Sequence, residues 1–330
     1  MTVPDPINRL QAGTGSIGII FNPFSGKNRK NIDGIRKHLQ DIPGADFREV
    51  RELKQMNVTL NALHSKPLDL LVIAGGDGMV QEVIRYLLDN HPRERWPLLS
   101  IIPGGTTNMT ASDLGISGNP ADHIARLQQF LNQDAFCTLV ERPALRVEQP
   151  GYAVNYGMFF GAGLIARGVK YSRSKIKKIG VTGGIFSAII ALRCLAGFIF
   201  GKGKGDWQPA ALTIRWPDNS ESSGQFLFAF ASTLNTLLFD STPYWGAEQA
   251  PVHVTMVRQH PGFSWWSFLR ILKGKGSEIR QPEIYSSTNS QTFELEMIDE
   301  YIIDGELYNT DVDARVLRIS VTEALTFLTL

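Results

Sequence analysis

Blocks of apolar and polar positions alternate through residues 16–131. Three blocks, 16–21, 68–74 and 98–102, are mainly apolar and end in turns that contain glycine or Asn-Pro. Between and after them, apolar residues recur every three or four positions, which is typical of one face of a helix. These positions are Ile32, Ile35 and Leu39; Val80, Val83, Ile84, Leu87 and Leu88; and Ile124, Leu127 and Leu131. Strands that are apolar on both faces and separated by helices predict a parallel sheet.

The pattern changes after residue 142, where short strand-like segments replace the alternation of strands and helices. Three of the predicted strands are 211–216, 225–231 and 293–297. We therefore expect an α/β domain over residues 1–142 and a β-rich domain over residues 143–330. Apolar and polar residues alternate again near the C-terminus, and the pattern leaves open whether the segment of about 309–330 packs back on the first domain.

The composition is that of a folded protein. Of 330 residues, 43% are apolar and 20% charged, which excludes disorder for most of the chain, and the length predicts about two domains. The 33 basic and 32 acidic residues leave a net charge of +1, which argues against a nucleic-acid partner. Cys137 and Cys194 predict neither a disulfide framework nor a zinc site. The first residues lack the apolar core of an export signal, so we expect a cytoplasmic protein.

One segment is long enough to cross a membrane. Ile179–Phe200 contains 22 residues with a single charge, Arg193. Its length alone would permit a membrane span. Its four glycines and the position of Arg193 favour a buried or interfacial helix instead.

Each of the three apolar strands is followed by a turn with ligand-binding potential. The turns are Asn22–Lys27, Gly75–Gly78 and Pro103–Asn108. The first offers backbone N–H groups and the Lys27 cation, which suit phosphate, and the second lets the backbone approach a ligand closely around Asp77. The carboxyl ends of parallel strands lie at one edge of a sheet, where ligands bind. Taken singly, the first and third turns are equally typical of ordinary chain reversals.

The three turns together resemble a known family. Asn-Pro-x-Ser-Gly-Lys at 22–27, Gly-Gly-Asp-Gly at 75–78 and Pro-x-Gly-Thr-x-Asn at 103–108 follow one another in this order. The ordered set resembles the diacylglycerol kinase catalytic domain family, which includes bacterial-type lipid kinases and is related to sphingosine and ceramide kinases. Two later segments, 155–163 and 304–306, also match, so the resemblance covers most of the chain.

The resemblance implies an N-terminal α/β domain with a parallel sheet like that of NAD kinases and phosphofructokinase, and a C-terminal β-sandwich domain. It implies a kinase that transfers the γ-phosphate of ATP, with Mg²⁺, to a hydroxyl of a diacylglycerol-like lipid. By position, Asp77 would face ATP–Mg²⁺, and Glu306 matches the family's proposed general base. The residues implied to bind the nucleotide are Asn22, Ser25, Gly26, Lys27, Gly75, Gly76, Gly78, Thr106 and Asn108.

Two departures from the family pattern keep alternatives open. Met109–Ser112 stands where the family usually has Asp-Phe-Ala-Arg, and the ceramide and sphingosine branches also lack that Asp. A sphingoid base or ceramide is therefore the alternative acceptor. Glu248–His253 lacks the Asp-Asp-Gly stretch that many bacterial members tie to a structural Mg²⁺, so we expect no such metal. More distant alternatives are a soluble kinase of the NAD kinase type and a catalytically silent lipid-binding protein.

A lipid substrate implies contact with a bilayer. Residues 167–178 contain six basic side chains, and a second cluster joins Trp265, Trp266 and Phe268 to Arg270, Lys273, Lys275 and Arg280. Basic residues beside tryptophan suit an anionic interface, so we expect peripheral contact with the inner face of the membrane. The alternative is a solvated basic face beside core aromatics. The sequence is also compatible with a homo-oligomer.

Overall fold

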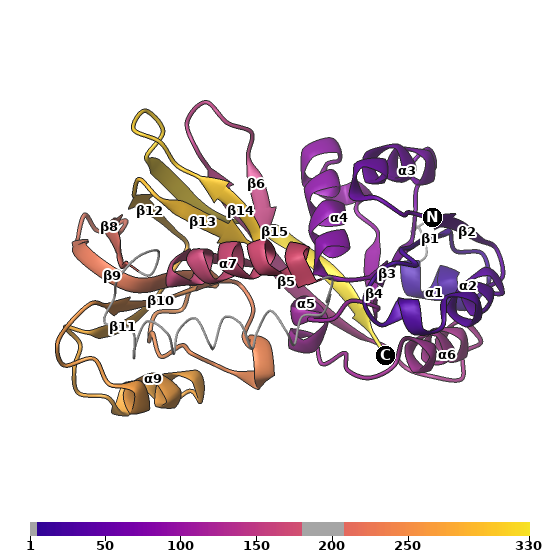
Figure 1. Ribbon diagram of the computed structural model, residues 1–330. Helices are drawn as coiled ribbons and strands as arrows, with labels where there is room; N and C mark the ends of the chain where they lie inside the picture. Colours follow the sequence, from indigo (N-terminus) through magenta and orange to yellow (C-terminus); the bar gives the residue numbers. More distant parts are fainter. Residues whose placement is uncertain (1–4, 180–207) are drawn as a thin grey trace. The chain divides into compact units, whose positions relative to one another are not determined.

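A computed structural model describes residues 5–179 and 208–330 (Figure 1). The chain divides into two compact units. The first comprises Met1–Arg142 together with Glu323–Leu330, and the second comprises Pro143–Thr322. Residues 323–330, at the C-terminal end of the chain, thus group with the first unit.

The first unit is built on a parallel sheet in the order β2-β1-β3-β4. The end of the last strand of the chain pairs with its edge, where Phe327 lies opposite Leu99 in parallel register. The four main strands are β1 (Ile17–Phe21), β2 (Ala45–Glu49), β3 (Leu70–Gly75) and β4 (Leu98–Pro103). All of β1 and β3 is buried, as their continuous apolar sequences predict.

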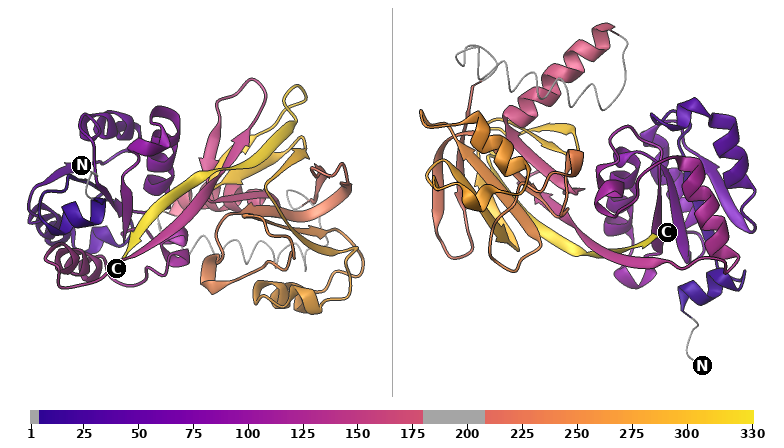
Figure 2. Two further views of the ribbon diagram at one scale, coloured as in Figure 1. Left: turned by 180° about the vertical axis from the view of Figure 1, so that it is seen from behind. Right: turned by 90° about the horizontal axis from the view of Figure 1, so that it is seen from below.

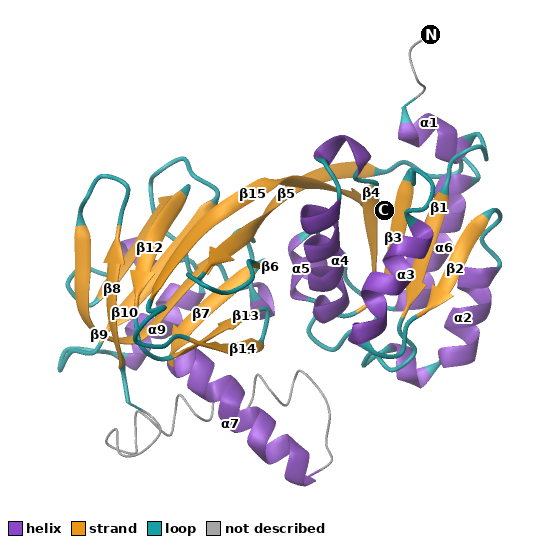
Figure 3. Ribbon diagram, turned by 90° about the horizontal axis from the view of Figure 1, so that it is seen from above, coloured by secondary structure: helices purple, strands orange, loops and turns teal. Residues whose placement is uncertain are grey.

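Helices cover both faces of this sheet (Figure 3). They are α1 (Pro6–Gln11), α2 (Ile32–Gln40), α3 (Met56–Leu63), α4 (Asp77–Asn90), α5 (Met109–Asp113) and α6 (Pro120–Leu131), with 3₁₀ turns η1 (Asn28–Lys30), η2 (Leu53–Gln55) and η3 (Arg93–Arg95). One core cluster joins the inner faces of α2 and α6 to the sheet. Helix α6 begins as its sequence predicts, because the Asn119 side chain accepts a hydrogen bond from the Ala121 N–H and Pro120 occupies the first turn.

The second unit is strand-rich and mainly antiparallel. Its strands run in the order β14-β13-β7-β9-β8-β12-β15, with β10 paired to β9 and β11, and β5 paired to β6 and β15. The bounds are β5 (Thr138–Glu148), β6 (Asn155–Gly157), β7 (Phe159–Gly163), β8 (Ala210–Arg215), β9 (Glu221–Ser232), β10 (Val252–Arg258), β11 (Tyr285–Ser290), β12 (Thr292–Glu296), β13 (Glu300–Ile303), β14 (Glu306–Asn309) and β15 (Val316–Thr329). Strands β5 and β15 contribute residues to both units.

Two helices accompany these strands (Figure 2). Helix α7 (Leu164–Ile179) begins directly after β7, and α9 (Trp265–Leu272) lies between β10 and β11 in the sequence. Two 3₁₀ turns, η4 (Leu238–Asp240) and η5 (Gly276–Glu278), complete the described elements of the unit. A second core cluster lies beneath α9 and includes Phe228, Phe268 and Ile271.

The expected fold class is confirmed as an α/β domain with a parallel sheet followed by a strand-rich domain. No helix among residues 5–179 and 208–330 is long and apolar enough to cross a membrane. The apolar segment expected to form a buried or interfacial helix, Ile179–Phe200, lies outside the described residues apart from Ile179, which ends α7.

Candidate functional site

The first turn follows β1 and is held in place by a buried asparagine. Asn28 is fully buried, and its amide nitrogen donates to the carbonyl oxygens of Asn22 at 2.8 Å and Ala74 at 3.2 Å. The Asn22 carboxamide oxygen in turn accepts the N–H of Phe24 at 2.8 Å. Asn28 thus ties the end of β1 to the end of β3. The sequence-based prediction missed it, although it directly follows Asn22–Lys27.

The second and third turns pack on each other through glycines. The Gly75 carbonyl accepts the N–H groups of Gly104 at 2.9 Å and Gly105 at 3.0 Å. A methyl group placed on Gly105 would lie 2.5 Å from the Gly76 Cα atom, closer than real Cβ atoms approach other atoms. Asn108 is buried in left-handed conformation, with φ of 50°, and its amide nitrogen donates to the Gly105 carbonyl at 2.9 Å. These contacts leave no room for a side chain at Gly105 and little at Gly76.

The first turn also contacts the third. The Lys27 N–H donates to the Gly104 carbonyl at 2.7 Å. A methyl group on Gly26 would lie 2.2 Å from the Thr106 hydroxyl oxygen, so these two residues are neighbours. All three turns predicted from the sequence therefore meet at the carboxyl ends of β1, β3 and β4, as parallel strands allow.

Several donors in this cluster are available to a ligand. Within the described part of the chain, the backbone N–H groups of Gly26, Gly76, Thr106 and Thr107 have no hydrogen-bond acceptor. Gly26, Thr106 and Thr107 are exposed, and Gly76 is half-buried. The Lys27 ammonium group donates to the Gly118 carbonyl at 2.8 Å, which leaves its other two N–H groups free to bind a ligand. Free backbone N–H groups beside a cation are suited to an anion such as phosphate.

Asp77 occupies the first position of α4, and its carboxylate points at the backbone of the third turn. An oxygen of Asp77 accepts the Thr110 N–H at 3.2 Å, and the backbone N–H groups of Asn108 and Met109 lie close to this carboxylate. Burial raises the pKa of Asp77, and nearby backbone N–H groups, including its own, oppose that rise only in part. The carboxylate therefore holds the end of the third turn and the start of α5 in position.

The residues present fit a magnesium ion only if a ligand supplies most of the oxygens. Among the described residues, no group of three or more Asp, Glu, His or Cys side chains could hold a metal. Mg²⁺ in phosphate-transfer sites usually binds one or two carboxylates together with substrate phosphates and water. Asp77 is one such carboxylate, and it lies beside the backbone N–H groups that are suited to phosphate. In the stretch 248–253, the Glu248 carboxylate is engaged by the Asn289 N–H at 2.8 Å.

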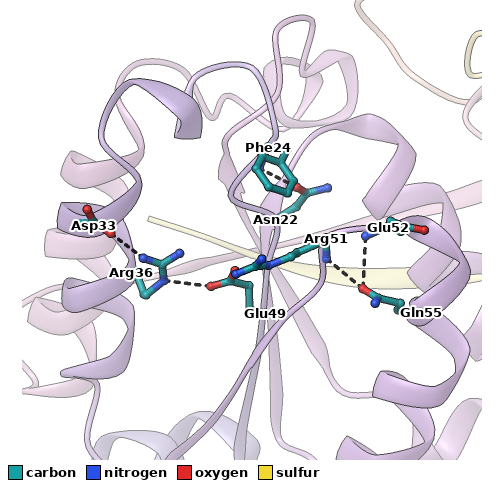
Figure 4. Close-up of polar contacts among 8 residues, drawn as sticks. All are labelled: Asn22, Phe24, Asp33, Arg36, Glu49, Arg51, Glu52 and Gln55. Atoms are coloured by element: carbon teal, nitrogen blue, oxygen red, sulfur yellow. Dashed lines mark hydrogen bonds and ion pairs between the residues drawn. The ribbon is translucent and has the colours of Figure 1, made fainter.

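A charged cluster lies beside the first turn and was not predicted from the sequence (Figure 4). Glu49, which ends β2 opposite Phe21 of β1, accepts hydrogen bonds from the Arg36 Nε atom at 2.9 Å and the Arg51 Nε atom at 3.0 Å. Burial alone would raise the pKa of Glu49, but the two guanidinium groups outweigh it and lower that pKa. Gln55 accepts the Arg51 N–H at 3.1 Å, which fixes the chain after β2.

A surface cavity of about 250 Å³ lies next to the second turn. Its lining residues come from η2, α3 and α4, and they are Leu53, Lys54, Asn57, Glu82 and Arg85. A methyl group on Gly78 would lie 3.8 Å from the Leu53 Cδ1 atom, so the cavity adjoins the N-terminal end of α4. Both charge signs line it, with the Arg85 guanidinium 2.5 Å from the Glu82 carboxylate.

Glu306 lies in the second unit, at the start of β14. The turn before it, Asp304-Gly305, has φ of 46° and 86°, which is the conformation of a tight two-residue hairpin. The Asp304 carboxylate accepts the N–H groups of Met158 at 3.0 Å and Phe159 at 2.9 Å. The two late matching segments, 155–163 and 304–306, are therefore in contact. Glu306, the last residue of the second segment, is exposed. The anchoring role of Asp304 was not predicted.

Comparisons with known proteins agree with this arrangement. Residues 16–136 match the family model described as diacylglycerol kinase catalytic domain. The chain is 34% identical over 106 residues to a diacylglycerol kinase of Bacillus subtilis (strain 168), and this match spans 30% of the chain and only about a third, 32%, of that protein.

Solved structures show the same fold at low sequence identity. The crystal structure of a diacylglycerol kinase from Bacillus anthracis str. Sterne is similar with a TM-score of 0.60 and 16% identity, over 96% of this chain and 97% of that chain. Yeast NADH kinase complexed with NADH is similar with a TM-score of 0.50 and 11% identity, over 96% and 83% of the respective chains. The fold is thus one shared by diacylglycerol kinase and NADH kinase structures. Residues 16–136 match the model of the diacylglycerol kinase catalytic domain family, which confirms, for this part of the chain, the resemblance inferred from the motifs.

Proposed function

We propose that this protein is an ATP-dependent lipid kinase that phosphorylates a hydroxyl of a diacylglycerol-like lipid. The observation that carries the proposal is the meeting of the three turns, with free N–H groups at Gly26, Thr106 and Thr107 in the described part of the chain. The family of residues 16–136 supports the type of reaction.

We assign the phosphates of ATP to the three turns. Phosphoryl transfer depends mainly on positioning and on stabilising negative charge. The free N–H groups would orient the phosphate oxygens, and Lys27 would add a positive charge. Mg²⁺, when bound, neutralises charge on the phosphates, and Asp77 is the candidate protein ligand.

We assign the nucleoside to the cavity beside Gly78, because it adjoins the turn that would hold the phosphates. Its charged lining can hydrogen-bond a polar ligand. A bulky Asn57→Trp substitution, at an exposed position of α3, should raise the KM for ATP with little effect on the melting temperature. An unchanged KM for ATP would place the nucleoside elsewhere.

We assign Glu306 the role of general base toward the lipid hydroxyl. A hydroxyl is a poor nucleophile, and a carboxylate that takes its proton as the oxygen attacks the γ-phosphorus assists the transfer. The oxygen–phosphorus bond to the acceptor forms, the bond to the β-phosphate oxygen breaks, and ADP leaves. The anchored hairpin of Asp304 and Gly305 holds this carboxylate in an exposed position.

The test is incubation with labelled ATP, Mg²⁺ and a panel of diacylglycerol, monoacylglycerol, sphingosine and ceramide. We expect transfer to diacylglycerol, and loss of transfer in Asp77→Ala and Glu306→Ala. Preferred transfer to sphingosine or ceramide would favour the alternative acceptor, for which the replacement of the family's Asp-Phe-Ala-Arg at Met109–Ser112 is the supporting observation. Substantial turnover in both variants would refute the assigned roles, and no turnover on any lipid would refute the proposal.

A further inference from the structure

Helix α9 of the second unit has one face fixed in the core. Phe268 and Ile271 are buried among the strands and loops of the second core cluster. The Ser264 side chain caps the first turn of the helix, and the Tyr285 hydroxyl accepts the Ser264 N–H at 2.8 Å. The helix is therefore held rigidly, and its opposite face has a defined orientation.

That outer face combines an exposed tryptophan with cations. Trp266, Arg270 and Lys273 are spaced four and three residues apart, so they lie along one stripe of the helix. Trp266 is 76% exposed, which is unusual for so large an apolar surface. Arg270 pairs with Glu278, whereas Lys273 has no ion-pair partner among the described residues. Four basic and two acidic residues in 264–283 leave an excess of positive charge around the stripe.

A second exposed aromatic side chain lies on a turn attached to the same helix. Phe239 of η4 is 78% exposed, and its backbone is left-handed, with φ of 58°. The chain just after this turn is bound to the C-terminal end of α9, because the Thr242 N–H donates to the Leu272 carbonyl at 3.3 Å. The helix and the turn thus form one continuous part of the surface.

The two basic side chains that the structure describes in α7 differ from those of α9. Arg167 and Lys170, the first two basic residues of α7, form ion pairs with Asp299 and Glu300 at the start of β13. The charges of these two residues are therefore balanced within the second unit. Among the described residues, the charge around Lys273 is not balanced in this way, which makes α9 a candidate for an external anionic partner.

We propose that the outer stripe of α9 (Trp266, Arg270 and Lys273), with Phe239, docks this protein on an anionic lipid bilayer. An exposed tryptophan has an apolar body and a polar N–H group, which suits the headgroup region. Lysine and arginine side chains beside it can reach anionic headgroups while their methylene stems lie against apolar surface. The inference rests on the proposed function to the extent that a lipid substrate brings the enzyme to a bilayer, but its test needs no catalytic activity.

The experiment measures sedimentation of the full chain with phosphatidylcholine vesicles, alone or containing about one third phosphatidylglycerol. We expect binding to the anionic vesicles only. Trp266→Ala should weaken partitioning about tenfold, and Lys273→Gln about fivefold. The matched controls are Phe136→Ala, which removes a 99% exposed aromatic side chain from the first unit, and Lys66→Gln, which removes an exposed cation there. Both controls should bind as the parent does.

A conservative variant separates lost contact from lost folding. Trp266→Phe should retain most of the binding but lose the part of the vesicle-induced tryptophan fluorescence shift that comes from this residue. Unchanged partitioning of both Trp266→Ala and Lys273→Gln, equal binding to neutral vesicles, or no binding by the parent would overturn the proposal. None of these outcomes depends on kinase turnover, so a failure of the proposed function would be recognised separately in the lipid panel.

Discussion

Substitution of Gly105 by alanine tests whether the second and third turns must touch. The new methyl group would lie 2.5 Å from the Gly76 Cα atom and 2.6 Å from the Asn108 carboxamide oxygen. Ordinary contacts of this kind are 3.4–4 Å, so the two turns must separate by about 1 Å. The Gly76 backbone cannot yield as the end of a flexible side chain would.

The expected effect on activity is larger than the effect on stability. A displacement of about 1 Å in groups that position a substrate costs on the order of a hundredfold in rate. Overpacking of this kind destabilises a protein by about 1–3 kcal/mol, which leaves most molecules of an ordinary domain folded. Gly105→Ala should therefore lose about two orders of magnitude in kcat/KM while remaining folded.

The assay is ATP-dependent phosphorylation of the preferred lipid, together with thermal unfolding with and without ATP and Mg²⁺. Gly78→Ala is the matched control for stability only, because its methyl group meets only the Leu53 Cδ1 atom at 3.8 Å. Alanine is also favoured over glycine by about 1 kcal/mol within a helix. Gly105→Ala with the turnover and the ATP-dependent stabilisation of the parent would refute the packing argument.

Three further predictions concern other parts of the chain. Asn28→Ala removes two buried hydrogen bonds and should lower the free energy of unfolding in urea by about 2 kcal/mol; an unchanged midpoint would contradict its structural role. Asp304→Ala should lower both the melting temperature and turnover, whereas Glu306→Gln should lower turnover alone. Burial lowers the pKa values of the stacked His64 and His91, so below about pH 6.5 the unfolded chain binds more protons than the folded chain does. Unfolding free energy should therefore fall between about pH 7 and pH 5, less steeply in His64→Phe.

The parallel sheet could be predicted wherever a strand is buried on both faces. Strands β1, β3 and β4 are continuous apolar runs, and each lies within one or two residues of its predicted bounds. Strand β2 was missed because it pairs only with β1 in the sheet and carries alternating half-buried and exposed residues, among them Asp46 and Arg48. An edge strand of this kind has no apolar run to reveal it.

The composition of the candidate site could also be predicted, but not the bonds that assemble it. Residues at strand ends were recognised because their types suit phosphate. Asn28 was not, because its role depends on Asn22 and Ala74, which lie 6 and 46 residues away in the chain. The ion pairs of Glu49 were missed for the same reason, since β2 itself was not predicted. Long-range hydrogen bonds leave no local pattern in a sequence.

The carboxylates in the two acidic motifs have a structural role that mutagenesis must separate from chemistry. Asp77 binds N–H groups at the start of α5, and Asp304 binds N–H groups at the start of β7. Each is an acidic residue beside glycine, and in each case the carboxylate joins one turn to a neighbouring segment. Loss of activity in an alanine variant would follow from either role. Asp77→Asn keeps one oxygen acceptor but removes the negative charge, so retained stability with lost Mg²⁺-dependent turnover would point to chemistry, whereas a parallel loss of stability would point to positioning.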